Sequence, residues 1–413
     1  MTKRTILYSA YSCDPFEVSE KYVAFIWLQM LLKQFTLILL TTKQAEASIK
    51  KYYKNTLPAN LQIIAFEDNY PFKSNRIVRN TVQLGYFFFN YKINRYLRKN
   101  PQTLNPCDLI FQKTPESYRH FTSLINFPKP VYIGPLSGGL KPPGVLKGYF
   151  KKEPLLYKIR NLDSLLLKLP VYQRQFLKAR KILVGLDYLD DILPKKYLKN
   201  KKVLMNSGVD CSLFPQADMS SKTTNIIFVG RLTRYKGAEL LIRAMVKLKD
   251  QDLRLQIFGE GEESQHLKEL VVNLDLVDKV VFKGFVQPLE MKFFYKAATI
   301  FCLPTFTESL GIAFLEAMAS GLPIITIDNG GPKFICPSQG AIKIPIMPEN
   351  DIINALTESI YFLIKNPGKA KEMGYFNRQY CQEHYDWQVI EKEVLDFFKS
   401  EIEYNDQFEH LNS

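Results

Sequence analysis

Histidine and tryptophan are scarce in this chain, with four and two copies among 413 residues, and its six cysteines are scattered. No two cysteines have C-x-x-C spacing, which argues against a disulfide framework or a zinc site and suits a reducing compartment. Four histidines leave little scope for a polyhistidine metal centre. We therefore expect a cytoplasmic protein that needs no metal and no bound cofactor.

Long apolar runs are also missing, because none reaches the ~18 residues that a membrane-spanning helix needs. The apolar part of the N-terminus, ILYSAYS, is short and stops at Asp14, so we expect a first strand there and not a signal peptide. A chain of this length with 46% hydrophobic residues can fill the cores of two domains.

Acidic residues are few in the first half. Residues 1–200 hold 32 Lys and Arg against 13 Asp and Glu, a net charge of +19, whereas residues 201–413 hold 23 against 28, a net charge of −5. This asymmetry predicts an anionic partner for the first half, either nucleic acid or an acidic membrane surface. Residues 74–99 and 146–181 interleave aromatic or leucine side chains with Lys and Arg, as membrane-surface segments do. Core faces with solvated lysines opposite would give the same pattern.

Short apolar runs alternate with amphipathic stretches along the chain, a pattern typical of βαβ units and parallel sheets. The expected strands are residues 5–11, 35–42, 61–66, 107–111, 129–134, 181–185, 225–230, 253–259, 279–284, 299–304 and 322–328. The expected helices are residues 17–33, 75–99, 154–180, 236–249, 262–274, 289–297 and 311–320. The fold class is therefore α/β. Turn residues at Asn206–Asp210 predict domains over 1–205 and 206–385, with 386–413 as a terminal helix.

One strand-to-helix corner is strongly basic. In FVGRLTRYKGAELL a strand ends at Gly230, and Arg231, Arg234 and Lys236 follow before a helix begins near Gly237. Ligands of open α/β sheets bind at the carboxyl ends of strands, beside helix N-termini. These cations suit a diphosphate, although a solvated basic loop would look the same.

A second corner carries paired acids. TESLGIAFLEAMASGLP predicts a loop and a helix, with Glu308 at the rim and Glu316 inside the helix. Ser309, Leu310 and Gly311 offer backbone N–H groups to an anion at the helix start. Carboxylates accept hydrogen bonds from vicinal hydroxyl groups, so one acid can hold a sugar ring and the other a ribose. Taken singly, each could equally be a helix-terminal charge or a partly buried ion-pair partner.

Together these motifs resemble a known family. GRLTRYKGAELLIRAM, IFGEGEE and TESLGIAFLEAMASGLPIIT look like the donor-binding domain of the large retaining glycosyltransferase family whose founders include sucrose and sucrose-phosphate synthases, over residues 206–345. The resemblance implies two facing Rossmann-like domains, the type B glycosyltransferase fold, with a C-terminal helix at HYDWQVI crossing back onto the first domain. Residues 1–205 would bind the acceptor and residues 206–385 the nucleotide-sugar donor.

The resemblance also implies residue roles. Arg231 and Lys236 would bind the donor's diphosphate and stabilise the leaving group, and Glu308 would contact the transferred sugar. The other donor-binding positions would be Gly230, Ser309, Leu310 and Gly311 near the phosphates, Glu316 at the ribose, and Phe285 and Val286 beside the base. Gly330 and Gly331, in DNGGPKFI, would shape a loop near the site.

The resemblance to the family is weaker in the first half of the chain. SCDPFEVSEKYVAF resembles a subgroup that has Gly-Ser-Glu where this chain has Val18, Ser19 and Glu20. Gly138 and Gly139, in GPLSGGLKPP, resemble the subgroup's glycine-rich loop. These four positions would line the acceptor side of the cleft: Ser19, Glu20, Gly138 and Gly139.

Two further motifs concern catalysis. In CDLIFQKTPESYR, Phe111 takes the place where the family often keeps a histidine near the reacting sugar, and His120 is better explained as a core or surface histidine. Asp187, Asp190 and Asp191 superficially resemble the Asp-x-Asp metal motif of the other glycosyltransferase fold. We place them on a solvent-facing helix instead.

The implied function is retaining transfer of a sugar from a nucleoside-diphosphate sugar to a hydroxyl of a glycan or lipid-linked acceptor, in cell-surface polysaccharide or lipopolysaccharide synthesis. The basic half would contact the inner face of the membrane, and no nucleic-acid partner is expected. One alternative is a catalytically impaired homologue that only binds a nucleotide-sugar or glycan, suggested by Phe111. A nucleic-acid binder is suggested by the isoelectric point alone. A nucleotide-sugar epimerase would lack the Arg-Lys and paired-glutamate spacing.

Overall fold

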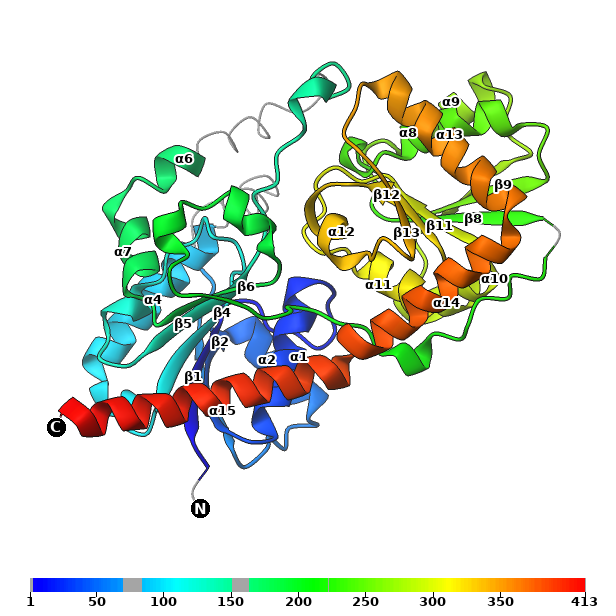
Figure 1. Ribbon diagram of the computed structural model, residues 1–413. Coiled ribbons are helices and arrows are strands. Elements are labelled where there is room, and N and C mark those ends of the chain that lie inside the picture. Colours follow the sequence, from blue (N-terminus) through cyan, green and yellow to red (C-terminus); the bar gives the residue numbers. More distant parts are fainter. Residues whose placement is uncertain (1–2, 70–83, 151–162, 222, 413) are drawn as a thin grey trace. The chain divides into compact units, whose positions relative to one another are not determined.

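The computed structural model describes residues 3–69, 84–150, 163–221 and 223–412 (Figure 1). The chain divides into two compact units, each built on one parallel β-sheet. Within the described residues, the first unit comprises 3–139, 163–206 and 391–412, and the second comprises 140–150 and 207–390.

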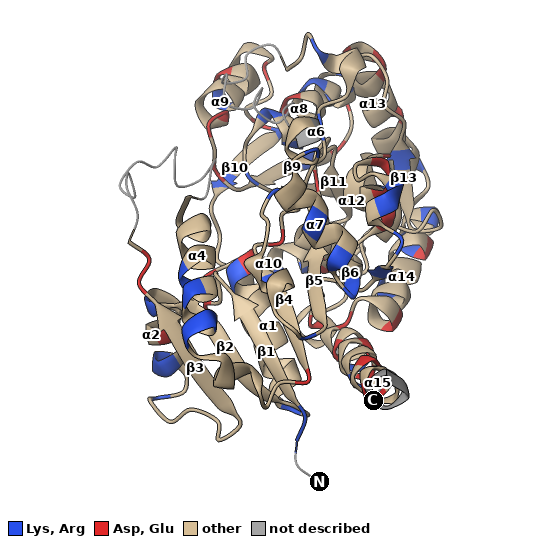
Figure 2. Ribbon diagram, turned by 90° about the vertical axis from the view of Figure 1, so that its left-hand side faces the viewer, with Lys and Arg blue, Asp and Glu red and all other residues tan. Residues whose placement is uncertain are grey.

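The first unit has a seven-stranded sheet in the order β3-β2-β1-β4-β5-β6-β7. Its strands are β1 Thr5–Ala10, β2 Thr36–Thr42, β3 Leu61–Phe66, β4 Leu109–Thr114, β5 Val131–Leu136, β6 Lys181–Val184 and β7 Lys201–Val203. Its described helices include α1 Glu20–Leu32, α2 Lys43–Tyr52, α4 Leu84–Lys99, α6 Asp163–Leu166, α7 Pro170–Lys178 and most of α15 Trp387–Asn412. Strands β1, β4 and β5 are buried along their whole length, as strands covered on both faces must be. Lys and Arg gather instead on helices such as α4 (Figure 2).

The second unit has a six-stranded parallel sheet in the order β10-β9-β8-β11-β12-β13. Its strands are β8 Thr224–Val229, β9 Leu253–Phe258, β10 Val280–Gly284, β11 Ile300–Leu303, β12 Ile324–Ile327 and β13 Ala341–Ile344. Its helices include α8 Ala238–Met245, α9 Ser264–Asn273, α10 Pro288–Ala297, α11 Ile312–Ala319, α12 Gly330–Ile335, α13 Glu349–Lys365 and α14 Pro367–His384. In both sheets the first strand is central and the order reverses beside it, which is the Rossmann arrangement. The predicted α/β class is confirmed.

The structure contains elements that the sequence analysis did not predict, among them the helices α2, α12, α13 and α14. The short edge strands β7 and β13 were not predicted, because three or four residues of mixed polarity show no periodicity. Residues 140–150 group with the second unit, whereas we expected them in the first. There Phe150 stacks on Tyr235 at 5.3 Å between ring centroids, and the Tyr149 hydroxyl donates to the Arg234 carbonyl. The predicted helical residues 75–83 and 154–162 lie outside the described residues.

Helix α15 belongs to both units. At its start, the backbone N–H of Trp387 donates to the carbonyl of Val209, within the second unit. Further along, in the first unit, Phe398 packs against Phe111 with ring centroids 4.8 Å apart, and Glu401 accepts a 2.8 Å hydrogen bond from Tyr132. None of the helices in the described ranges combines the length and apolarity that crossing a bilayer demands.

Candidate functional site

The corner between β8 and α8 is held against the loop that follows β11. After Gly230 the chain forms a short 3₁₀ turn, Arg234–Lys236, and then Gly237 adopts a left-handed conformation with φ of 71°. A Cβ atom at Gly237 would lie 2.2 Å from the carbonyl oxygen of Pro304, so glycine is needed for both conformation and space. This close approach brings Lys236 beside the loop that carries Glu308.

Hydrogen bonds fix the contact between the two corners. The backbone N–H of Phe306 and the hydroxyl of Thr305 both donate to the carbonyl of Tyr235, at 2.8 and 3.3 Å. Within this frame, the ammonium of Lys236 forms an ion pair with Oε2 of Glu308. Their side chains are only 22% and 18% exposed, so the pair is shielded from much of the solvent screening that weakens surface ion pairs.

Helix α11 begins in the same loop. Its N-cap is Gly311, with φ of 86°, and its first turn leaves backbone N–H groups that no residue of the helix can accept. Ser309 and Leu310, which precede Gly311, are partly exposed, as is Glu308. The Lys236–Glu308 pair therefore adjoins the positive end of a helix dipole, an arrangement that favours a bound anion.

A third corner, between β12 and α12, supports this loop from the other side. The backbone N–H of Gly331 donates a 2.7 Å hydrogen bond to the carbonyl of Glu308. A Cβ atom at Gly331 would lie 2.5 Å from the carbonyl oxygen of Ser309. The neighbouring Asn329 side chain donates to the carbonyl of Phe306. The loop from Phe306 to Ser309 is thus held rigidly, with Gly330 and Gly331 at its back.

Glu316 is held by a residue that no motif indicated. Its Oε2 accepts a 2.8 Å hydrogen bond from the hydroxyl of Tyr295, on α10. Burial raises the pKa of Glu316, and the hydrogen bond from Tyr295 opposes that rise. The sequence signal for Tyr295 was only an aromatic residue in an amphipathic helix, which is the ordinary signature of a core position. The contact orients the Glu316 carboxylate rather than neutralising it.

The remaining predicted donor residues lie apart from these contacts. Arg231 is exposed, and among the described residues it forms no ion pair with Glu308 or Glu316. Phe285 and Val286 follow β10, which lies two strands from β8 in the sheet, and Phe285 is 62% exposed. The structure thus brings Lys236 and Glu308 together, and it leaves Arg231 and Phe285 open to solvent.

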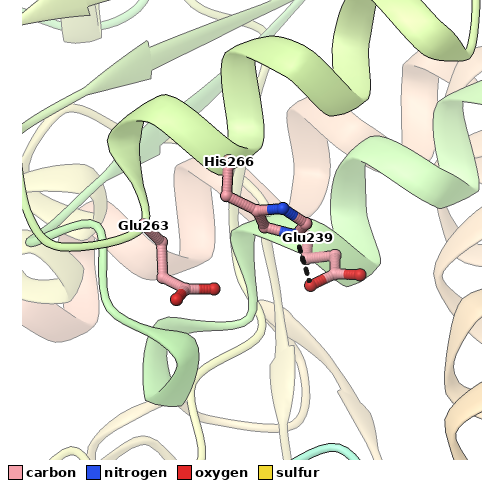
Figure 3. Close-up of side chains that lie close together, drawn as sticks. All are labelled: Glu239, Glu263 and His266. Carbon is pink, nitrogen blue, oxygen red and sulfur yellow. Dashed lines mark hydrogen bonds and ion pairs between the residues drawn. The ribbon is translucent and has the colours of Figure 1, made fainter. Parts of the chain in front are cut away.

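Arg234 is engaged elsewhere in the same corner. Its guanidinium forms ion pairs with Glu263 at 3.0 Å and Glu239 at 3.4 Å, and Glu239 also pairs with Arg243 at 2.8 Å. Burial is the largest single effect and raises the pKa of Glu239, but Arg243, Arg234 and His266 together outweigh it and leave that pKa below its ordinary value. Figure 3 shows that the side chains of Glu239, Glu263 and His266 lie close together, as the ligands of a metal ion would. Because arginine already neutralises both carboxylates, the cluster serves to fix the corner.

In the first unit, the predicted acceptor-side residues lie at the carboxyl edge of the sheet. Ser19 has a positive φ of 59° and precedes α1. Oε1 of Glu20 accepts a 3.0 Å hydrogen bond from the backbone N–H of Glu116. Burial, and next the charge of Glu116, raise the pKa of Glu20 to about 7. Gly138 and Gly139 follow β5, and the N–H of Gly138 donates to the Tyr188 hydroxyl.

A buried charge network that sequence reasoning missed lies beside Glu20. Lys113 is completely buried, and its ammonium donates to Glu116 at 2.6 Å and to the side-chain oxygen of Asn206 at 2.8 Å. Asn206 in turn donates to Glu116 at 2.8 Å, and the Trp27 indole donates to its carbonyl. The network anchors the last residue of the first unit before the chain enters the second.

The structure shows the surroundings of two residues that bear on catalysis. Phe111, expected beside the reacting sugar, lies inside β4, fully buried among Tyr8, Trp27 and Phe398, and it does not reach the carboxyl edge. His120 lies against Tyr86, and burial lowers its pKa to about 4, so it is a neutral core histidine at pH 7.

The aspartates that resemble a metal motif form a surface ion-pair cluster. They lie in the 3₁₀ turn Asp187–Asp191 of the first unit, where Lys201 pairs with Asp187 at 2.7 Å and Asp190 at 2.6 Å.

Two Rossmann-like units of this kind are the type B glycosyltransferase fold. A solved structure of sucrose-phosphate synthase from Thermosynechococcus elongatus has the same fold, with a TM-score of 0.65 at 17% identity, covering 96% of this chain and 99% of that one. Residues 213–380 match the family described as "Glycosyl transferases group 1". This part of the chain is therefore similar to the group 1 glycosyl transferases.

Sequence relatives match part of the chain. An uncharacterised glycosyltransferase of Methanocaldococcus jannaschii is 34% identical over 179 residues, which are 43% of this chain and 45% of the relative. A GDP-mannose-dependent monoacylated α-(1-6)-phosphatidylinositol monomannoside mannosyltransferase of Corynebacterium glutamicum is 29% identical over 217 residues, 47% of this chain and 55% of the relative. The chain thus spans about half the length of the curated relatives it matches.

Proposed function

We propose that this protein is a retaining, metal-independent glycosyltransferase that moves a sugar from a nucleoside-diphosphate sugar to a hydroxyl of a glycan or lipid-linked acceptor. The observation that carries the proposal is the Lys236–Glu308 ion pair at the mouth of α11. The pair places a cation that can bind the diphosphate beside a carboxylate that can accept hydrogen bonds from sugar hydroxyls. The mannosyltransferase relative, whose name states a GDP-mannose donor and a lipid acceptor, supports a donor and acceptor of this class.

The ion pair leaves capacity for a ligand. An ammonium has three N–H donors, so Lys236 can bind Glu308 and still donate to a diphosphate. The free N–H groups at the start of α11 and the exposed guanidinium of Arg231 would provide further hydrogen-bond donors to the diphosphate. As the glycosidic bond breaks, negative charge grows on the departing diphosphate, and these groups would stabilise that charge. Positive charge from these sources would take the part that a metal plays elsewhere.

Glu308 and Glu316 take different hydroxyl groups in this proposal. Glu308 would accept from hydroxyls of the transferred sugar, next to the phosphate that leaves. Glu316 would accept from the ribose, with Tyr295 holding its Oε2 and leaving Oε1 for the nucleoside. Phe285 and Val286 would flank the base, and Ser19, Glu20, Gly138 and Gly139 would border the acceptor. No protein nucleophile is involved, so the acceptor hydroxyl would attack from the face that the diphosphate leaves.

The setting we propose is the cytoplasmic face of a membrane, in cell-surface polysaccharide or lipopolysaccharide synthesis. Helix α4 supports this, because Tyr91 and Phe88 are exposed on it while Lys92, Arg95, Arg98 and Lys99 accompany them (Figure 2). Each cation near an anionic surface contributes about 1 kcal/mol. The rest of the two basic segments includes residues outside those described.

A thermal-shift panel of UDP- and GDP-sugars tests the donor site. A donor that binds only the folded protein raises its melting temperature. We expect at least one such donor to do so, and we expect Glu316→Ala and Lys236→Ala to abolish the rise. No rise with any donor of the panel would contradict the proposal.

A transfer assay with the identified donor then separates an enzyme from a non-catalytic binding protein. Retention predicts that the product has the anomeric configuration of the donor, which nuclear magnetic resonance reads directly. Binding without turnover would instead favour the impaired homologue, although Phe111, which suggested it, lies in the core.

A further inference from the structure

A cavity of about 380 Å³ lies in the first unit, at the opposite end of the sheet from the predicted acceptor residues. Its lining includes Pro130 and Val131, where β5 begins, and Arg180, immediately before β6. Substrates of open α/β sheets bind at the carboxyl ends of the strands. A cavity at the amino ends is therefore a separate site, and its volume is in the range of small-molecule pockets.

Three cations converge on this cavity. Lys129, Lys178 and Arg180 line it, no carboxylate lies among its lining residues, and Asn405 supplies the only uncharged polar side chain. Within the described residues, neither Lys129 nor Lys178 forms an ion pair. Three positive charges gathered around one volume repel one another, so an anion between them would relieve that repulsion.

Arg180 is held in place for such a ligand. Its guanidinium lies over the ring of Tyr404, 4.5 Å from the centroid, and its backbone N–H donates to the carbonyl of Val131 at 2.8 Å. A positioned guanidinium loses little freedom on binding and can grip two oxygens of a phosphate at once, while each lysine adds a point charge.

The rest of the lining is apolar. Ile125, Phe127 and Val131 form that part of the cavity. Leu177, which precedes the lining residue Lys178 on α7, is 55% exposed. A ligand that matches both features carries a phosphate on an apolar body.

We propose that this cavity binds a phosphate monoester attached to an apolar group, with the phosphate among Lys129, Lys178 and Arg180 and the apolar group on Phe127 and Ile125. The ligand could be a lipid headgroup with the upper part of its chains or a free phosphorylated metabolite. The exposed Leu177 beside Lys178 favours the lipid. The site goes beyond the proposed transfer reaction and stands without it.

Calorimetric titration of the full chain tests the proposal with two probes. Dihexanoyl phosphatidic acid, kept below its micelle concentration, supplies phosphate and chains, and glycerol 3-phosphate supplies the phosphate alone. We expect one molecule of the lipid probe to bind, about tenfold or more tightly than glycerol 3-phosphate, because burial of a few methylene groups adds that much. Equal binding of the two would show that the apolar group contributes nothing and would overturn that part of the proposal. No binding of either would overturn the proposal.

Variants locate the binding. Lys129→Gln/Lys178→Gln removes two cavity charges and breaks no ion pair of the described residues, so the fold should persist, as circular dichroism would verify. We expect this double substitution to weaken binding of the lipid probe at least about tenfold. Arg180→Lys keeps the charge but loses the guanidinium that binds two phosphate oxygens. It should weaken binding of the lipid probe less than the double substitution does. The matched control, Lys195→Gln/Lys199→Gln, removes the same charge from exposed positions elsewhere in the first unit and should leave binding unchanged. Equal weakening by the control would show diffuse attraction and overturn the cavity assignment.

Discussion

Lys236 and Glu308, 72 positions apart in the sequence, form an ion pair where the corners that follow β8 and β11 meet. Neighbouring strands β8 and β11 bring them together, and Gly237 allows the approach. The pair concentrates opposite charges at the start of a helix. We therefore expect the two members to differ in what their loss does to binding and to turnover.

Lys236→Met should weaken donor binding and lower turnover, because it removes the cation that faces the departing diphosphate. Glu308→Gln should leave donor binding within a few-fold and reduce kcat by about tenfold or more, because a neutral amide accepts more weakly than a carboxylate from the hydroxyls of the transferred sugar. Titration calorimetry and steady-state kinetics measure the two effects. Lys268→Met, an exposed lysine on α9, is the control and should change neither. If Glu308→Gln lost donor binding as completely as Lys236→Met, the division of roles would be wrong.

Tyr295→Phe should raise the KM for the donor several-fold with kcat nearly unchanged. The substitution keeps the ring in the core but removes the hydrogen bond that orients Glu316. Removing an interaction that acts equally in the ground state and the transition state changes binding more than chemistry. Glu316→Ala should have the larger effect on KM, and combining the two substitutions should add little to Glu316→Ala alone. Additive effects would show that Tyr295 acts independently of Glu316.

Gly237→Ala should destabilise the protein by about 1–3 kcal/mol, because the residue has a left-handed conformation and the new methyl group would meet the Pro304 carbonyl. Donor binding should fall as well, since the corner that carries Lys236 must shift. Gly368→Ala is the matched control. No atom lies within 4 Å of a Cβ there, and the position is in α14, so the same substitution should stabilise slightly. Urea unfolding of both variants measures the contrast, and equal effects would contradict this account.

The partly buried carboxyl group of Glu20 should make the stability of the protein depend on pH. Its pKa in the folded protein is raised to about 7 from a value of 4.5, so the folded state holds this proton more tightly than the unfolded chain. Below about pH 4.5 both states are protonated and there is no penalty. As the pH rises towards 7 the unfolded chain releases the proton first, so stability falls across that window. Lys113, Glu116 and Lys21 are the charges that act on Glu20.

Glu20→Gln tests this directly. Its amide oxygen can still accept from the backbone of Glu116, but it carries no proton to lose. We expect the melting temperature of the variant to exceed that of the wild type increasingly as the pH rises from about 4.5 to about 7. Parallel pH profiles for the two proteins would show that Glu20 ionises as an ordinary exposed carboxyl group.

The sequence predicted the features that depend on strand order and local spacing. Strand β8 with its basic loop and strand β11 with its acidic loop were recognisable because each is an apolar run followed by turn residues. Both parallel sheets followed from that alternation.

Side-chain neighbours in the core could not be predicted in the same way. Strand β4 is buried on both faces, so its sequence gives no alternation to show that Phe111 faces Phe398 or that Lys113 is sealed inside with Glu116. Likewise, Tyr295 reads as one aromatic among several, and only packing shows that its hydroxyl meets Glu316. Residues 140–150 join the second unit through ring contacts that local spacing does not encode.

Helix α15 has a consequence for how the protein is made. Phe111 and Tyr132 in the first unit contact Phe398 and Glu401, and the whole second unit is synthesised between these two pairs of residues. During translation the first unit therefore lacks these contacts until the second unit has emerged. A nascent chain that stalls before residue 391 would leave the apolar ring of Phe111 without Phe398, so we expect such chains to be more prone to aggregation than longer ones.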